Sequence, residues 1–287
     1  MDRFRRLTVA LLLALVAAST VTAQQPGQEQ KPPAPQPGQQ PGQQQGQQPG
    51  QQPAADAQTP PVNAEEEADY KTFFEIPRED PQGAIDAGEA FLKKFPDSRY
   101  TGSVYSRLVG AYLLLGDVDK LYVAGEKALE INPENVDVLA VFAYAVPRKV
   151  RAQDLDAQAK LEKVERYAKH AMNLLNAMVK PEGLSDEDFN RAKDEKLSMA
   201  HSGLAMVSYH RRDFPTMASE LEQATQLSAA PDPSDFYLLA LAYQQMTRFN
   251  DAATAFGKCA DAVWDFQNTC RQGKEQALKQ AAVQPKP

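Results

Sequence analysis

The 287-residue chain is poor in the side chains that carry most enzyme chemistry, with three histidines, two cysteines and one tryptophan. His201 and His210 are nine residues apart, which does not place them on one helix face for metal binding, and His170 lies farther away. The sequence contains no G-x-S-x-G, no H-E-x-x-H and no phosphate-binding glycine loop. We therefore predict a protein that is not an enzyme and has no metal site and no cofactor.

Excess positive charge is also missing. The formal net charge is −7 and the pI is about 5.2, which argues against nucleic acid as a partner because phosphate binding needs a basic face. After residue 23 the sequence has no apolar run long enough to cross a membrane. We expect no membrane span in the mature chain.

Residues 1–23 have the pattern of a secretory signal peptide. Three arginines precede an apolar run over residues 7–16, and Val21, Thr22 and Ala23 end the segment with small residues. An uncleaved membrane anchor is the alternative, although the run is short for a span. Since no cysteine lies near the cleavage point, lipid anchoring is not indicated. The pattern predicts export to the periplasm or the cell exterior.

Residues 24–58 consist almost wholly of Gln, Pro and Gly, with the motif PGQQ beginning at Pro37, Pro41 and Pro49. Without any apolar side chain larger than alanine, the segment buries too little surface to offset the entropy of ordering. We predict a disordered linker over residues 24–63. It is a passive tether or a weak contact to cell-wall polymer.

Residues 102–135 predict two amphipathic helices joined by a tight turn. The turn is Gly116-Asp117, and Pro133 ends the second helix because proline lacks a backbone N–H. The apolar positions are Tyr105, Leu108 and Tyr112 in the first helix and Leu121, Ala128 and Ile131 in the second. This pattern resembles the tetratricopeptide repeat (TPR).

Further copies follow on both sides of this repeat. Helices are expected over residues 65–76, 81–95, 136–146 and 186–211, and the second clear copy spans residues 233–266. About nine residues are inserted near 148–163, as a helical extension or a loop. His201 occupies the slot that Tyr105 and Phe236 fill, which favours packing over chemistry. Residues 64–287 are thus expected to form an all-α, right-handed α-solenoid of about five stacked helix pairs, capped by a C-terminal helix over 267–282.

The resemblance implies that a partner binds in a concave groove lined by the first helix of each pair. The matching positions in this chain are Ser106, Leu113, Tyr144, Arg148, Ser202, Met206, Tyr209, Tyr237 and Gln244. The paired Lys and Asn with which some relatives clamp a C-terminal carboxylate are missing, so that activity is not implied.

Cys259 and Cys270 are the two cysteines. In one continuous helix they would lie about 16 Å apart, too far for a disulfide. The repeat register instead places a helix break between them, so that antiparallel neighbours bring them within reach. We expect a disulfide that pins the C-terminal cap; two buried thiols are the alternative.

The resulting prediction is an exported, non-catalytic scaffold that binds a protein or peptide. Residues 91–98, FLKKFPDS, resemble repeat proteins of outer-membrane assembly, so a component of a cell-envelope assembly or secretion machinery is the alternative. An accessory to a carbohydrate- or wall-processing enzyme is a third, less favoured possibility.

Overall fold

The computed structural model describes residues 63–283, and this part of the chain is helical without a strand. The predicted signal peptide and almost all of the predicted linker lie outside the described residues. The helices are α1 (Ala64–Glu75), α2 (Pro81–Lys94), α3 (Thr101–Leu115), α4 (Val118–Ile131), α5 (Val136–Ala145), α6 (Ala157–Ala177), α7 (Asp186–His210), α8 (Phe214–Leu227), α9 (Pro233–Gln245), α10 (Phe249–Asp261) and α11 (Gln267–Val283). A 3₁₀ turn, η1 (Val146–Arg148), follows α5.

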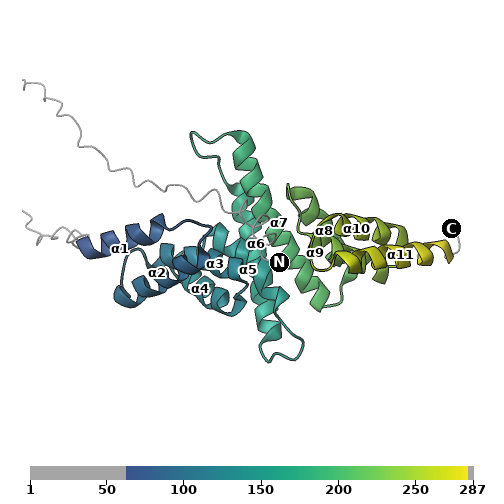
Figure 1. Ribbon diagram of the computed structural model, residues 1–287, viewed down its shortest axis with the longest axis horizontal. Coiled ribbons are helices and arrows are strands. Elements are labelled where there is room, and N and C mark those ends of the chain that lie inside the picture. The colour runs from purple at the N-terminus through teal and green to yellow at the C-terminus, as the bar shows by residue number, and fades with distance from the viewer. Residues whose placement is uncertain (1–62, 284–287) are drawn as a thin grey trace, which may run out of the picture. The chain divides into compact units, whose positions relative to one another are not determined.

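Helices next to each other in sequence pack against each other along the chain (Figure 1). We call α1, α3, α5, α7 and α9 the first helices and α2, α4, α6, α8 and α10 the second helices of five pairs, with α11 packed on α10 as the cap. The predicted all-α solenoid is therefore confirmed. The predicted insertion is a loop over residues 149–156, exposed for the most part but with Val150 buried, and the first part of α6.

Three tight turns between first and second helices share one construction. The amide of the residue that follows the left-handed position donates back to the carbonyl five residues earlier: Asp117 to Tyr112, Asp213 to Ser208 and Arg248 to Tyr243. Asp117 and Asp213 then cap the next helix by accepting from the amides of Lys120 and Thr216. The repeat signal at Gly116-Asp117 therefore reflects a hydrogen-bonded turn that recurs in the structure.

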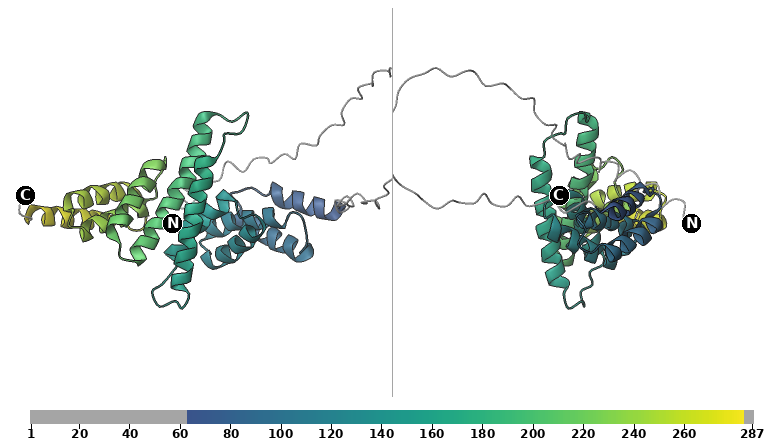
Figure 2. Two further views of the ribbon diagram at one scale, coloured as in Figure 1. Left: turned by 180° about the vertical axis from the view of Figure 1, so that it is seen from behind. Right: turned by 90° about the vertical axis from the view of Figure 1, so that its left-hand side faces the viewer.

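The long helices α6 and α7 run side by side, and both pack on α5 (Figure 2). Their contact uses small residues: Ala143, Ala168 and Ala200 are fully buried together with Leu204. Gly203 lies against the backbone of Ala143, where a Cβ would come within 2.7 Å of the carbonyl carbon. Small side chains thus permit the close approach of three helices at this point.

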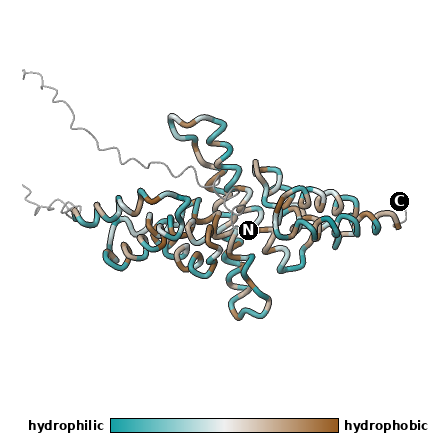
Figure 3. Tube along the Cα trace, viewed as in Figure 1, coloured by the Kyte–Doolittle hydropathy of each residue, from teal (hydrophilic) through white to brown (hydrophobic). Residues whose placement is uncertain are grey.

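Two larger apolar clusters lie on either side of this contact, and apolar positions recur along the helices between polar ones (Figure 3). The N-terminal cluster runs from Phe73 in α1 to Val207 in α7. The C-terminal cluster runs from Ala205 in α7 to Ala277 in α11. Helix α7 contributes to both, so it is the apolar link between the two parts of the stack.

The shared turn predicts a stabilising substitution. Gly116 has φ 72°, and Thr247 holds the equivalent position in the α9–α10 turn with φ 57°, a conformation that is costly for a β-branched residue. We expect Thr247→Gly to raise the free energy of unfolding by about 1 kcal/mol, measured by urea denaturation. The matched change Gly116→Ala should lower it by a similar amount. Destabilisation by Thr247→Gly would contradict this account of the turn.

Candidate functional site

The predicted groove residues lie on the first helices and on η1, in three settings. Ser202 and Met206 are buried in α7, and Tyr209 at the end of that helix is 43% exposed. The half-buried members are Ser106, Leu113, Tyr144, Arg148, Tyr237 and Gln244. The structure joins three of the nine, Tyr144, Arg148 and Ser202, in one polar network, and places the others apart from it.

This network, which we call the junction network, consists of Tyr144, Arg148, Ser202, Asp232 and Asp235. The Nη2 atom of Arg148 donates to Ser202 Oγ at 2.6 Å and to Asp235 Oδ1 at 2.9 Å. Ser202 Oγ donates to the same carboxylate oxygen at 2.6 Å. These bonds link η1, α7 and α9, and Arg148 and Asp235 are 87 positions apart in sequence.

Tyr144 fixes the other side of the guanidinium. The guanidinium carbon of Arg148 lies 3.8 Å from the centre of the Tyr144 ring. The Nη1 atom of Arg148 donates to the Tyr144 carbonyl. The Tyr144 hydroxyl donates to Asp232 Oδ2. The other oxygen of Asp232 caps α9 by accepting from the amide of Ser234 at 2.8 Å. The Asp232 side chain thus caps the N-terminus of α9 and links that helix to Tyr144 of α5.

The junction network holds two carboxylates and one guanidinium, and Arg148 and Asp232 in it are half-buried. Asp235 is 3% exposed. Burial raises the pKa of Asp235 to about 6, Asp232 acts in the same direction, and Arg148 and Ser202 oppose the rise. Burial opposes the charge on Arg148, but Tyr144, Asp235 and Asp232 outweigh it and raise the pKa of Arg148. Because these hydrogen bonds run within the network, its role is to position three helices.

The predicted site residues include neither Asp232, the partner of Tyr144, nor Asp235, the partner of Arg148. The sequence did offer one indication of such a partner. Arg148 is the one charged residue among the predicted groove positions, and a buried arginine needs a carboxylate partner. The sequence offers many acidic residues, and nothing local selects these two.

A second group of side chains lies near the C-terminal cap. Tyr237 of α9 contacts Trp264 and Phe266 of the loop over residues 262–266, with ring centres 6.5 Å and 6.2 Å apart. Trp264 and Phe266 lie 5.3 Å from each other. Tyr237, a predicted groove residue, is therefore part of an aromatic cluster that includes two loop residues absent from the prediction.

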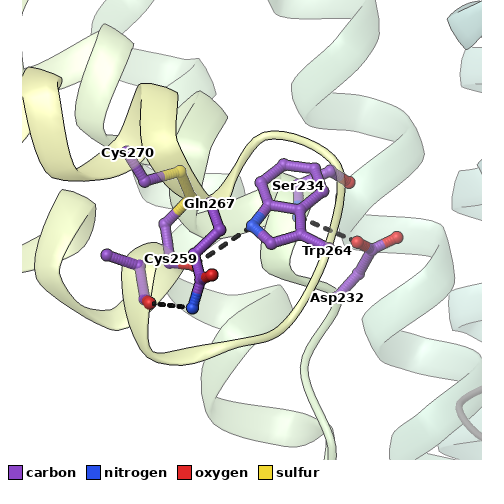
Figure 4. The surroundings of a disulfide bond; sticks show 7 residues. Asp232, Ser234, Cys259, Trp264, Gln267 and Cys270 are labelled. Carbon is purple, nitrogen blue, oxygen red and sulfur yellow. Dashed lines mark hydrogen bonds between the residues drawn. A yellow bond between two sulfur atoms is a disulfide. The ribbon is translucent and has the colours of Figure 1, made fainter. Parts of the chain in front are cut away.

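Cys259 near the end of α10 and Cys270 near the start of α11 flank this loop, at disulfide distance (Figure 4). Their Cα atoms lie 5.8 Å apart. The indole Nε1 of Trp264 donates to the carbonyl of Cys259 at 3.1 Å, and Gln267 Nε2 donates to the carbonyl of Ala260 at 3.0 Å. Helix α10 ends at Asp261 and α11 begins at Gln267, so the helix break expected between the cysteines is present.

The histidines take part in separate local contacts. The Nδ1 atom of His201 lies 2.7 Å from Glu220 Oε2, and His210 Nε2 lies 2.9 Å from the carbonyl of Pro147. Within residues 63–283, no group of three or more His, Cys, Asp or Glu side chains is placed to hold a metal ion. In the same part of the chain, no helix has both the length and the apolar character to cross a membrane.

Comparison with solved structures gives two similar proteins of low identity. PilW, a widely conserved type IV pilus biogenesis factor, is 16% identical with a TM-score of 0.51, over 77% of this chain and 89% of PilW. The thermophilic TPR protein TTC0263 of Thermus thermophilus is 18% identical with a TM-score of 0.47, over 75% of this chain and 99% of that one. No family model matches, and neither does any curated protein. The helix pairs and the likeness to PilW define an α-solenoid fold of stacked helix pairs.

The junction network predicts an asymmetric response to mutation. Removing one partner of a buried ion pair leaves the other charge uncompensated, so Arg148→Met should cost about 3–5 kcal/mol of unfolding free energy. The double change Arg148→Met/Asp235→Asn should recover a large part of that loss. A double-mutant cycle by urea denaturation measures both. Equal losses for the single and double variants would show that the uncompensated charge of Asp235 is not the source of the cost.

The paired cysteines predict a thiol count. Protein exported by its own signal and then denatured should show no free thiol, because both sulfurs are joined. Protein treated with reductant before denaturation is the control and should show two. Two reactive thiols in the untreated exported protein would establish the buried-thiol alternative.

Proposed function

We propose that this chain is an exported, non-catalytic scaffold that binds a protein or peptide partner along its first helices. The observation that carries the proposal is the placement of Tyr209 and Tyr237. They lie on successive first helices, α7 and α9, and neither is buried. Tyrosine is enriched in protein interfaces because it offers a large contact area with a polar end.

Export is supported by the sequence at residues 1–23 and by the cysteine pair. A signal-like segment followed by a Gln/Pro/Gly tether is the arrangement of a domain held away from its site of export. Disulfides form and persist in oxidising compartments, and Cys259 and Cys270 lie within bonding distance. The proposed location is the periplasm or the cell exterior.

A part in cell-envelope assembly is the second candidate. Pilus biogenesis is the role of PilW, and at 16% identity the likeness supports the shared fold alone. The features of this chain that favour an envelope role are the signal-like segment and the tether. The same experiment addresses both candidates because it identifies the captured partner.

The test is crosslinking in cells that produce the full chain, followed by identification of the captured protein. Tyr209→Ala/Tyr237→Ala should reduce capture at least about tenfold, as expected for loss of two aromatic contacts at an interface. Val123→Ala/Leu278→Ala, at exposed positions on α4 and α11, is the matched control and should capture normally. Circular dichroism confirms that each variant folds. Undiminished capture by the double tyrosine variant would exclude the first helices as the binding surface.

A further inference from the structure

The loop over residues 262–266, Ala-Val-Trp-Asp-Phe, exposes large apolar side chains. Val263 is 74% exposed and Phe266 is 53% exposed. The corresponding connections between earlier pairs, Asn-Pro-Glu-Asn over residues 132–135 and Ser-Ala-Ala-Pro-Asp over 228–232, contain proline and polar or small residues. Exposed apolar groups gathered in one place mark interaction surfaces.

The loop is braced from both ends. Cys259 and Cys270 join its flanking helices, and Trp264 and Gln267 bond back to carbonyls in the last turn of α10. The exposed side chains therefore stand on a backbone that is already ordered. Such preorganisation favours binding because little conformational entropy is lost when a partner docks.

Tyr237 connects the loop to the first helices. With Val263, Trp264 and Phe266 it forms what we call the aromatic platform, and the three rings are in mutual contact. Tyr237 lies two residues after Asp235 on α9, whose first turn belongs to the junction network. Tyr237 is also one of the two tyrosines proposed above to bind the partner, so the platform adjoins that surface.

The charges beside the platform favour a cation. Asp265 of the loop itself is exposed, between Trp264 and Phe266 in sequence. Of the cations on the two flanking helices, Lys258 lies over the Phe236 ring, Arg271 donates to Asn268, and Lys274 lies beside Gly257 of α10. Aromatic faces themselves attract lysine and arginine.

We infer that the aromatic platform binds a partner segment in which a lysine or arginine adjoins a large apolar residue. The apolar side chain packs on Val263 and Phe266, and the cation lies against the ring faces beside Asp265. This inference rests on the proposed scaffold function and names the chemistry of its partner.

Trp264 is the single tryptophan of the chain, so its fluorescence reports on the platform directly. The probe is a short labelled peptide of alternating lysine and leucine, added to the full mature protein. We expect saturable binding by anisotropy together with a change in tryptophan emission. Peptides of alternating glutamate and leucine, and of alternating lysine and serine, are the comparison probes and should bind at least about tenfold more weakly.

Val263→Ser/Phe266→Ser should weaken binding of the lysine–leucine peptide at least about tenfold, because it removes exposed apolar groups without opening the core. Val123→Ser/Leu278→Ser, also at exposed apolar positions, should bind as the wild type does. Equal affinity for the glutamate–leucine peptide, no binding of the lysine–leucine peptide, or undiminished binding by the Val263/Phe266 variant would each overturn the inference.

The same loop variant in the crosslinking experiment separates the two proposals. If capture is lost with Tyr209→Ala/Tyr237→Ala but retained with Val263→Ser/Phe266→Ser, the scaffold proposal is supported and the platform proposal is excluded. If capture is undiminished with both variants, the proposal that the partner binds along the first helices is excluded as well.

Discussion

The ion pair between Arg148 and Asp235 adds a polar connection where the two apolar clusters share only helix α7. One cluster ends in α7, and the other begins there. The junction network crosses this division through η1, α7 and α9. A buried ion pair adds little net stability compared with apolar packing, but its hydrogen bonds have strict geometry. Its contribution is therefore to fix how the first helices α5, α7 and α9 are placed relative to one another.

The local structure around Arg148 serves this placement. Helix α5 ends at Ala145, and Pro147 in the following 3₁₀ turn cannot continue its hydrogen bonds. Small residues on α5, α6 and α7 then allow a close approach, which carries Ser202 to the guanidinium. This geometry occurs in the one pair, α5–α6, that has an insertion between its two helices. The other pairs have short turns at this place.

The features predicted from sequence are those that local chemistry determines. Gly116-Asp117 specifies a turn through backbone conformation and capping, and the helix expected over residues 186–211 is α7. The helix break between Cys259 and Cys270 follows from the repeat period. The pairing of Arg148 with Asp235 does not follow from the repeat period. The two residues are 87 positions apart, and their contact depends on how their two helices are packed. The chain also has many other acidic residues. The family resemblance supplied the helix positions of Tyr144, Arg148 and Ser202 but not their partners.

This pairing bears on how the chain recognises a partner. Arg148 is the one arginine among the predicted groove positions, and it already binds Asp235, Ser202 and the Tyr144 carbonyl. To clamp a partner's carboxylate it would have to release Asp235, leaving a buried acid without its cation, which costs several kcal/mol. A charge clamp at this position is therefore disfavoured by the structure itself. In the proposed function, recognition therefore falls to side chains with free contact area, such as Tyr209 at 43% exposed, and to the exposed side chains of the loop that the cysteine pair holds in place.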